Sequence, residues 1–576
     1  MATKATGVTP VWRIAALSRV AMVLLMLTFD ALVDDYDTSG RLSPDDGVSG
    51  KSSVSDEHLR SPSSPLCAAV EGLVTWDAVY FQRISEVGYE HEQTHAFFPL
   101  IPAVTRGLGS LGASASSALA GATSSDGGNG MKTHPPPRQS RRCARAASAL
   151  FISNGAHVAA AVVLERLGTL VLEGDDDVAR SAAVLFALNP ASVFHSAPFY
   201  TESVFALAGF AGFYFLELAG ARFSLSESAT YSAFSVWNRN GAALCFALAC
   251  AARSNGALNG LVLAHDFFAR VLPSVAEAAA RGLGKNKNGL EKNKRGLGKN
   301  AREASLASVL VLPLFAATFA FAARCATMLA PLFAVQLYGY RTYCARALGA
   351  ETPAWCGRWR PFPDVYAHVQ SHYWNVGFLR YYEAKQIPNF LLAAPALAVS
   401  ASAGRSWWTA LNRSNTHNAR KRDENEPTDY SYAGTASRRG GSAADGGKFP
   451  DKNASSLKKK RKRNIIAYGS DEDDFWMLSP SVRPYLFKWA VMSVVALLVM
   501  HVQVTTRFLS VTPGIYWFLA KRGFAEAERE KSAGERKRKK TSGKRRESVW
   551  RRAVTTYSIS FFMLGALLFP TFYPWT

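Results

Sequence analysis

An apolar run, IAALSRVAMVLLMLTFDALV (Ile14–Val33), lies near the N-terminus. It has the length of about 20 residues that a helix needs to cross about 30 Å of hydrocarbon. Comparable apolar runs recur along the chain: Ala146–Leu172, Thr201–Ala219, Ala242–Leu272, Leu306–Val335, Pro388–Ala401, Tyr485–Val504 and Val554–Phe572. The sequence therefore predicts an all-α protein, a multi-pass bundle of about nine to eleven transmembrane helices.

The net charge of +22, from 66 Lys and Arg against 44 Asp and Glu, is concentrated in a few polar segments. Almost all of the excess lies in Arg281–Glu303, Asp451–Arg463 and Lys521–Arg552. Such runs can bind nucleic acid or anionic lipid, but these lie between apolar spans and lack interleaved aromatic residues. We therefore interpret them as cytosolic loops that follow the positive-inside rule, and we expect no nucleic-acid partner.

The positive-inside rule assigns a side to each loop. The first apolar run is interpreted as a retained signal-anchor with a cytosolic N-terminus, because no small-residue cleavage site is evident. The weak, Gly- and Ser-rich run Phe97–Ala120 would then return the chain to the cytosol. This threading predicts that the arginine-rich segment Gly121–Arg145 is cytosolic and that the acidic segment Glu173–Asp177 is lumenal.

Domain organisation follows from the same threading. The first expected part is a membrane domain over 1–400, which carries lumenal loops at 34–96 and 336–386 and a basic cytosolic insertion at 281–303. The second is a disordered cytosolic insertion over 404–480. The third consists of C-terminal transmembrane helices over 481–576 with a basic loop at 521–552. The insertion at 404–480 is rich in Ser, Asn, Gly and charge, which is typical of disorder.

The first of these loops contains WDAVYFQRISEVGYEHEQTHAFFPLIP (Trp76–Pro102), in which carboxylates, histidines and aromatics adjoin apolar spans. Polar clusters beside hydrocarbon are costly and often functional. Asp77 is a candidate general base for a hydroxyl group. An N-cap role at the start of a short interfacial helix is an equal alternative. Trp76 and His91 are candidate substrate-binding residues.

The same stretch spells HExxH at His91–His95, the pattern of zinc metalloproteases. That pattern requires both histidines on one helix face and a third ligand. Gly88 before the motif and Pro99 after it leave room for barely two turns, and Asp364 is the only third ligand that suggests itself. The metalloprotease interpretation is therefore the weaker one, and we expect no metal cofactor.

The second polar loop contains SHYWNVGFLRYYEAKQIPN (Ser371–Asn389), where charged residues stand among tyrosines and Trp374. Arg380 and Lys385 could bind a phosphate. His372 and Trp374 could contribute to a sugar or lipid pocket. The alternative is an interfacial belt of Trp, Tyr and Arg. Cys344 and Cys356 share this loop and could pair in an oxidising lumen.

Two further charges interrupt apolar runs. Arg253, in ARSNG, must face a polar cavity or lie at a helix break, because a charge at mid-membrane costs about 2.5–3.5 kcal/mol on insertion scales. Glu202, in YTES, is either a pocket residue or a carboxylate favoured by a helix N-terminus.

Several long segments together resemble the PIG-V family of GPI mannosyltransferases, which are GT-C glycosyltransferases. They are Trp76–Pro102, LNPASVFHSAPFYTESVFAL from Leu188, ARSNGALNG from Ala252, HYWNVGFLRYYEAKQIPNFLLAAP from His372, HVQVTTRFLSVTPGIYWF from His501 and the terminal Pro574-Trp575. The resemblance implies a GT-C bundle in the endoplasmic reticulum membrane. It implies transfer of a second, α-1,6-linked mannose from dolichyl-phosphate mannose to a GPI-precursor glycolipid on the lumenal side.

The resemblance also implies residue roles. GT-C enzymes carry an acidic residue in the first lumenal loop, which matches Asp77 as the base, with Glu92 as a weaker second. The donor leaves as a phosphate, so one carboxylate and a cationic clamp would suffice, with Arg253, Arg380 and Lys385 as the clamp. His95 is incidental to the family pattern. Membrane lipids and a small membrane partner subunit are further expected partners. The alternatives are another dolichyl-phosphate-sugar transferase and a non-enzymatic scaffold.

Overall fold

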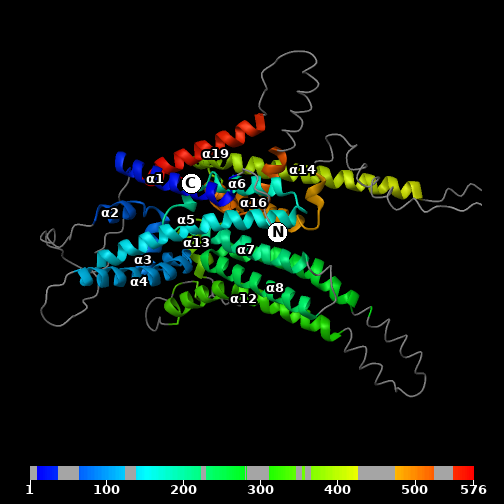
Figure 1. Cartoon of the computed structure of the whole chain (residues 1–576), viewed down its shortest axis with the longest axis horizontal. Coiled ribbons are helices and arrows are strands. Elements are labelled where there is room, and N and C mark those ends of the chain that lie inside the picture. The colour runs from blue at the N-terminus through cyan, green and yellow to red at the C-terminus, as the bar shows by residue number, and fades with distance from the viewer. Residues whose placement is uncertain are drawn as a thin grey trace, which may run out of the picture. The chain divides into compact units, whose positions relative to one another are not determined.

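A computed structural model describes residues 9–36, 64–123, 138–221, 229–278, 281, 311–345, 353, 355–356, 365–425, 474–523 and 549–575. Within these ranges every regular element is helical and there is no β-strand (Figure 1). The predicted all-α fold is therefore confirmed.

Five helical stretches among the described residues are long and apolar enough to cross a membrane. They are α1 (Val11–Leu32), most of α5 (Arg138–Val171), α7 (Glu202–Ala221), α12 (Leu312–Tyr343) and a stretch, Ala384–Thr416, that covers the first part of α14 (Ile387–Asn425). The chain is thus a multi-pass membrane protein, as predicted. A total of about nine to eleven spans remains a prediction.

Other helices and helical turns connect and flank these spans. In the N-terminal half they are α2 (Pro65–Gly72), α3 (Asp77–Val87), η2 (Glu92–Ala96), α4 (Leu100–Thr123), α6 (Asp176–Ala187), η3 (Ser192–His195), α8 (Ala229–Ala252), η4 (Ser254–Asn259), α9 (Gly260–Asp266) and η5 (Phe267–Val271). In the C-terminal half they are α13 (Val365–His372), η7 (Ala384–Gln386), η8 (Phe475–Leu478), α16 (Arg483–Leu498), η9 (Val502–Val504), α17 (Thr505–Leu509) and α19 (Val549–Leu568).

The chain divides into two compact units, 1–400 together with 484–576, and 401–483. The predicted boundary at Gly404 falls inside α14, which continues to Asn425, so 404–425 is helical rather than disordered. The rest of the predicted insertion up to 473 lies outside the described residues, as do most of the basic segments 281–303 and 521–552. The predicted loop 336–386 also begins later, because α12 runs to Tyr343.

In the larger unit α5 is the central helix. It packs against α1, α4, α6 and α7, and α7, α8 and α12 lie side by side (Figure 1). Small residues allow the close approaches. A Cβ atom on Gly212 of α7 would lie 2.3 Å from the Phe246 ring of α8. Close packing of this kind lets helices associate in a bilayer, where lipid chains are as apolar as the helices.

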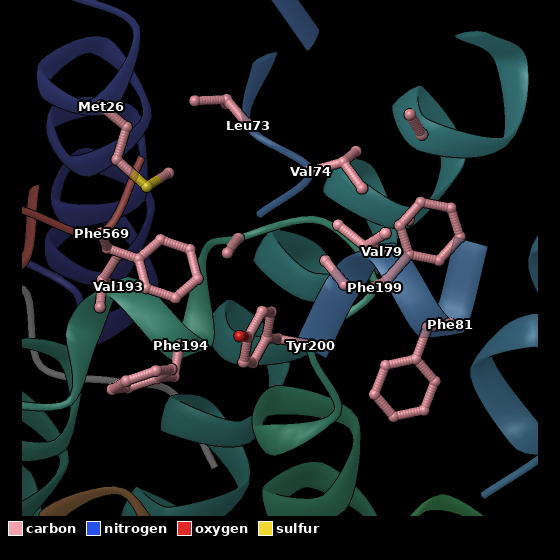
Figure 2. Close-up of a cluster of buried hydrophobic side chains, with 14 of the residues drawn as sticks. Met26, Leu73, Val74, Val79, Phe81, Val193, Phe194, Phe199, Tyr200 and Phe569 are labelled. Atoms are coloured by element: carbon pink, nitrogen blue, oxygen red, sulfur yellow. The ribbon is translucent and has the colours of Figure 1, made fainter. Parts of the chain in front are cut away.

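A buried apolar cluster joins α1, α3, η3 and α19 (Figure 2). Met26, Val79, Phe194, Tyr200 and Phe569 belong to it. Phe194 and Tyr200 each contact the Phe569 ring, with centroids 5.4 and 5.2 Å apart. The cluster therefore fixes the start of α3, where Asp77 lies, against the C-terminal helix.

A disulfide between Cys67 of α2 and Cys143 of α5 contradicts the predicted side of Gly121–Arg145. Bonded cysteines share one compartment, so Cys143 lies on the same side as the first polar loop. The basic residues there were misleading because Arg142 is bound by that loop. It donates to Gln82 (3.1 Å) and lies 3.7 Å from the Glu86 carboxylate. α4 therefore does not carry the chain across the membrane.

A second contact corrects the side of Glu173–Asp177. Lys521 Nζ lies 2.5 Å from Asp175 Oδ2, although the two residues were predicted on opposite sides. The acidity of this segment reflects helix capping, since the Asp175 side chain accepts from the Val178 amide at the start of α6. Both corrections agree, because α5 connects the two segments and crosses in the direction opposite to the prediction.

Candidate active site

A pocket of about 620 Å³ opens between the segments that the sequence singled out. Its polar end is lined by Asp77, Arg253 and Arg507. Aromatic and aliphatic side chains form its walls: Phe81, Phe97, Phe98, Trp374, Val495, Val499 and Met500. The pocket thus combines a charged end with a surface suited to lipid or sugar.

The local backbone at Trp76 directs Asp77 toward this pocket. Trp76 is the N-cap residue of α3 and has a left-handed φ of 55°, an uncommon conformation for a large side chain. Its indole Nε1 donates to the Phe569 carbonyl oxygen (3.2 Å), and its ring lies against Phe572. The Asp77 amide donates to the Tyr200 hydroxyl (3.2 Å). The N-cap alternative for Asp77 therefore does not hold, and its carboxylate is available for other partners.

The partner of that carboxylate is Arg507, on α17. Arg507 Nη1 lies 3.0 Å from Asp77 Oδ2, and its Nε donates to Glu202 Oε1. The guanidinium carbon also lies 5.0 Å from the ring centroids of both Phe194 and Tyr200. Burial alone would lower the pKa of Arg507, but the Glu202 and Asp77 carboxylates outweigh it and raise that pKa above its ordinary value.

Arg253 completes the arrangement from the break between α8 and η4. Its backbone is extended there (φ −156°), so both alternatives given for Arg253 hold: it lies at a helix break and it faces a polar cavity. Its Nη1 donates to Glu202 Oε1 and lies 3.3 Å from Thr201 Oγ1. Asp77, Arg507, Glu202 and Arg253 therefore form a row of alternating charge, hereafter the charge chain. Glu202 is buried at its centre, while the other three line the pocket.

Chemically, the charge chain offers one carboxylate and two guanidiniums to the same cavity. A carboxylate can accept a proton from a hydroxyl group. Guanidinium groups bind phosphate oxygens and stabilise developing negative charge. Glu202 offsets the repulsion between the two cations, so that they can lie close together.

Glu92 lies in a different cluster. It accepts from the Trp355 indole (2.6 Å) and the Tyr373 hydroxyl (3.4 Å), and its carboxylate lies 3.2 Å from His368 Nε2. We call Glu92, Trp355, His368 and Tyr373 the loop clasp, because it joins the two polar loops. None of the four lines the pocket. Cys344 and Cys356, which the sequence analysis named as able to pair, form a disulfide beside it.

The remaining predicted residues of the second loop lie mostly outside the pocket. Only Trp374 lines it. His372 stacks on His368, with centroids 5.1 Å apart. Arg380 reaches the Ser371 carbonyl oxygen (3.4 Å), and Lys385 pairs with Glu383 while 73% of its side chain is exposed. The structure therefore does not bring Arg380 and Lys385 to Asp77.

The HExxH residues do not form a zincin helix. Glu92–Ala96 is a five-residue 3₁₀-helix, and His91 precedes it. His95 is buried among Tyr89, Tyr338 and Tyr343, and burial lowers its pKa. Among the described residues no three His, Cys, Asp or Glu side chains are grouped so that they could hold a metal ion.

Arg507 was not singled out from the sequence, although it lies in the segment HVQVTTRFLSV. The signal that identified Arg253 applies to it equally, since Arg507 is a lone charge between two apolar runs. His501 of the same segment also lines the pocket, where its Nε2 lies 2.6 Å from the Trp374 carbonyl oxygen.

The sequence matches one family of known proteins along most of the chain. The model of the mannosyltransferase (PIG-V) family matches residues 8–120, 139–279 and 306–576. The GPI alpha-1,6-mannosyltransferase 2 of Mus musculus is 28% identical over 597 residues, covering 98% of each chain. That of Homo sapiens is 29% identical over 542 residues, covering 88% of this chain and 83% of its own. The GPI mannosyltransferase 2 of Chaetomium globosum is 30% identical over 398 residues, covering 64% of this chain and 69% of its own.

Among solved structures, the apo oligosaccharyltransferase of Archaeoglobus fulgidus matches with a TM-score of 0.36 and 13% identity. The match covers 97% of this chain and 56% of that one.

Proposed function

The chain belongs to the PIG-V family of mannosyltransferases, and we propose that it transfers the second, α-1,6-linked mannose from dolichyl-phosphate mannose to the GPI-anchor precursor. The observation that carries this proposal is the charge chain at the end of the 620 Å³ pocket. It supplies the base and the anion-binding groups that such a transfer requires.

In the proposed reaction an acceptor hydroxyl oxygen attacks the anomeric carbon of the donor mannose. The bond from that carbon to the phosphate oxygen breaks, and dolichyl phosphate leaves with the electron pair. The hydroxyl proton passes to the Asp77 carboxylate. A β-linked donor would give an α-linked product by this single displacement.

Arg253 and Arg507 are proposed to bind the donor phosphate. The leaving phosphate is a weak base, so its departure needs charge stabilisation rather than a strong general acid. Both guanidiniums line the pocket and share one buried carboxylate, Glu202, which holds them in a fixed orientation. Preorganised charges of this kind need little rearrangement as the transition state forms.

The pocket walls agree with substrates that carry lipid chains. Val495, Val499 and Met500 follow one another along α16 and its C-terminal end and present apolar surface beside the charged end. Dolichyl phosphate and a phosphatidylinositol lipid both join a polar head to long hydrocarbon chains. Trp374 and Phe97 offer rings against which a sugar can pack.

A lumenal site in the endoplasmic reticulum is part of the proposal. Disulfides persist in oxidising compartments. Cys67–Cys143 joins α2 to α5, and Cys344–Cys356 lies beside the loop clasp; α2 and the clasp belong to the two polar loops next to the pocket. This supports a pocket that opens on the lumenal side of the membrane.

The test is a mannosyl-transfer assay in microsomes from cells that lack their own second GPI mannosyltransferase. Wild type, Asp77→Asn and Glu90→Gln would be expressed at matched levels, and the glycolipids resolved by chromatography. Glu90 is a suitable control because it belongs to the same stretch but pairs with Arg83 (2.7 Å) away from the pocket. We expect a two-mannose GPI lipid with wild type and Glu90→Gln, and none with Asp77→Asn.

Two results would count against the proposal. Equal product from wild type and Asp77→Asn would remove Asp77 from the mechanism. No product from well-expressed wild type would exclude this acceptor, leaving a transferase for another glycolipid or a scaffold.

A further inference from the structure

His195 is a buried histidine that the proposed reaction does not use. It ends η3, beside the apolar cluster that contains Val193 and Phe194 (Figure 2), and its side chain is fully buried. A buried imidazole needs hydrogen-bond partners for both ring nitrogens, because an unpaired buried polar group is costly. The partners of His195 belong to the two elements that carry Glu202 and Arg507.

One ring nitrogen reaches α7. Nδ1 lies 3.2 Å from the hydroxyl oxygen of Ser203, which directly follows Glu202. The Ser203 hydroxyl itself donates to the His195 carbonyl oxygen (2.8 Å). That bond uses the only hydroxyl hydrogen of Ser203, so the His195 Nδ1 must carry a proton and donate it to Ser203.

The other ring nitrogen reaches the end of α17. Nε2 lies 3.0 Å from the hydroxyl oxygen of Ser510. In the neutral ring Nε2 carries no proton, so it can only accept from Ser510. The Ser510 hydroxyl also donates to the Arg507 carbonyl oxygen (2.7 Å), so its one hydrogen is shared between these two acceptors. The Ser510 carbonyl accepts from Tyr516 (2.6 Å). His195 therefore contacts the turn that begins at Arg507.

η3 itself is anchored to α1. Arg19 is buried in α1 and donates to the Ser192 carbonyl oxygen (2.9 Å), the Ser192 hydroxyl (2.8 Å) and the Ser196 hydroxyl (2.9 Å). The turn that carries the His195 ring is therefore held in place by Arg19 of α1. A fixed ring with one bond to each side can hold the separation between α7 and α17.

We propose that His195 is a positioning residue that joins the first turn of α7 to α17 and so holds Glu202 and Arg507 where Arg507 reaches Asp77. The catalytic consequence rests on the proposed function. His195 does not line the pocket and makes no contact with Asp77, so it acts only through the placement of Glu202 and Arg507.

The experiment compares His195→Phe, which removes both hydrogen bonds but keeps a ring, with Ser510→Ala, which removes only the bond to α17. His157→Phe is the matched control. His157 is equally buried and its ring lies 4.9 Å from that of His195, but it makes no hydrogen bond to Ser203 or Ser510. The kcat and the KM for the donor would be measured in the microsomal assay for each variant.

We expect kcat to fall by about 10- to 100-fold in His195→Phe, because small displacements of catalytic groups cost factors of this size. Ser510→Ala should fall less, and the double variant no further than His195→Phe. In an Arg507→Lys background His195→Phe should have little additional effect. A purely structural role would instead lower the activity of both backgrounds equally.

Several results would overturn the inference. They are activity of His195→Phe equal to that of His157→Phe, additive effects of His195→Phe and Ser510→Ala, or a full effect of His195→Phe in the Arg507→Lys background. Thermal unfolding of the same purified variants in detergent gives a readout that does not depend on transfer. Additive shifts of the unfolding midpoint for His195→Phe and Ser510→Ala would overturn the proposed link from His195 to α17. Absence of product from wild type would overturn only the proposed function.

Discussion

Asp77 and Glu92 belong to one stretch of sequence and both bind residues distant in the chain, yet their surroundings differ. Asp77 has one charged partner, Arg507, and 36% of its side chain remains exposed at the pocket. Glu92 has three partners, Trp355, His368 and Tyr373, and none of them faces the pocket.

This difference is the basis on which we propose Asp77, rather than Glu92, as the reactive carboxylate. Three donors occupy most of the lone-pair sites of the Glu92 carboxylate, and they hold it away from the pocket where a substrate proton would be. Asp77 lines the pocket, and its cationic partner is itself held by Glu202. The number and position of partners, rather than residue type or neighbours in sequence, distinguish the two.

The largest expected effect comes from removing the partner of Asp77. Arg507→Gln leaves Glu202 buried with only Arg253, and breaking a buried ion pair costs about 3–5 kcal/mol. We expect loss of measurable mannosyl transfer together with a lower unfolding midpoint in detergent. Transfer within a few-fold of wild type would show that Asp77 works without the charge chain.

A more conservative change tests the proposed phosphate-binding role of Arg253 alone. Arg253→Lys keeps the positive charge but loses the planar group that binds phosphate through two bonds. We expect transfer to fall by about 10- to 100-fold with little change in stability, because one guanidinium contact of this kind is worth about 2–3 kcal/mol. The donor concentration dependence of the rate measures this loss, and an unchanged rate would exclude Arg253 from phosphate binding.

Glu92→Gln should sharpen the contrast with Asp77. The amide still accepts a hydrogen bond but loses the charge that strengthens the contacts to His368 and Trp355, at a cost of about 1–2 kcal/mol. We therefore expect a lower unfolding midpoint and transfer within about threefold of wild type at permissive temperature. A loss as large as that of Asp77→Asn would return Glu92 to the mechanism.

The smallest effect is expected at the exposed cations. Lys385→Gln and Arg380→Gln remove charges that do not line the pocket, and exposed ion pairs contribute little to stability. Transfer rates within about twofold of wild type are expected. A clear increase in the KM for the donor in either variant would place the second loop in donor binding.

The sequence was sufficient for five long apolar helices and for the alternative of a helix break at Arg253, since both depend on local pattern, and it named Cys344 and Cys356 as cysteines that could pair. It was insufficient for sidedness, because Arg142, next to Cys143, is bound by Glu86 and Gln82 of the first polar loop. Arg507 was missed because its significance depends on Asp77, which is distant in the chain. Arg380 does not line the pocket, although its aromatic neighbours favoured such a position; its role in binding remains a prediction.

Arg19 gives α1 contacts inside the fold that a predicted signal-anchor would not need. A targeting sequence is read by its hydrophobicity and flanking charge, so one can usually be exchanged for another. Here Arg19 donates to both hydroxyl and carbonyl groups of η3, and replacement of α1 by an unrelated leader would leave those acceptors unpaired in the interior. Recombinant forms of this protein should therefore keep their own first helix, with any tag or exchange made before Val11.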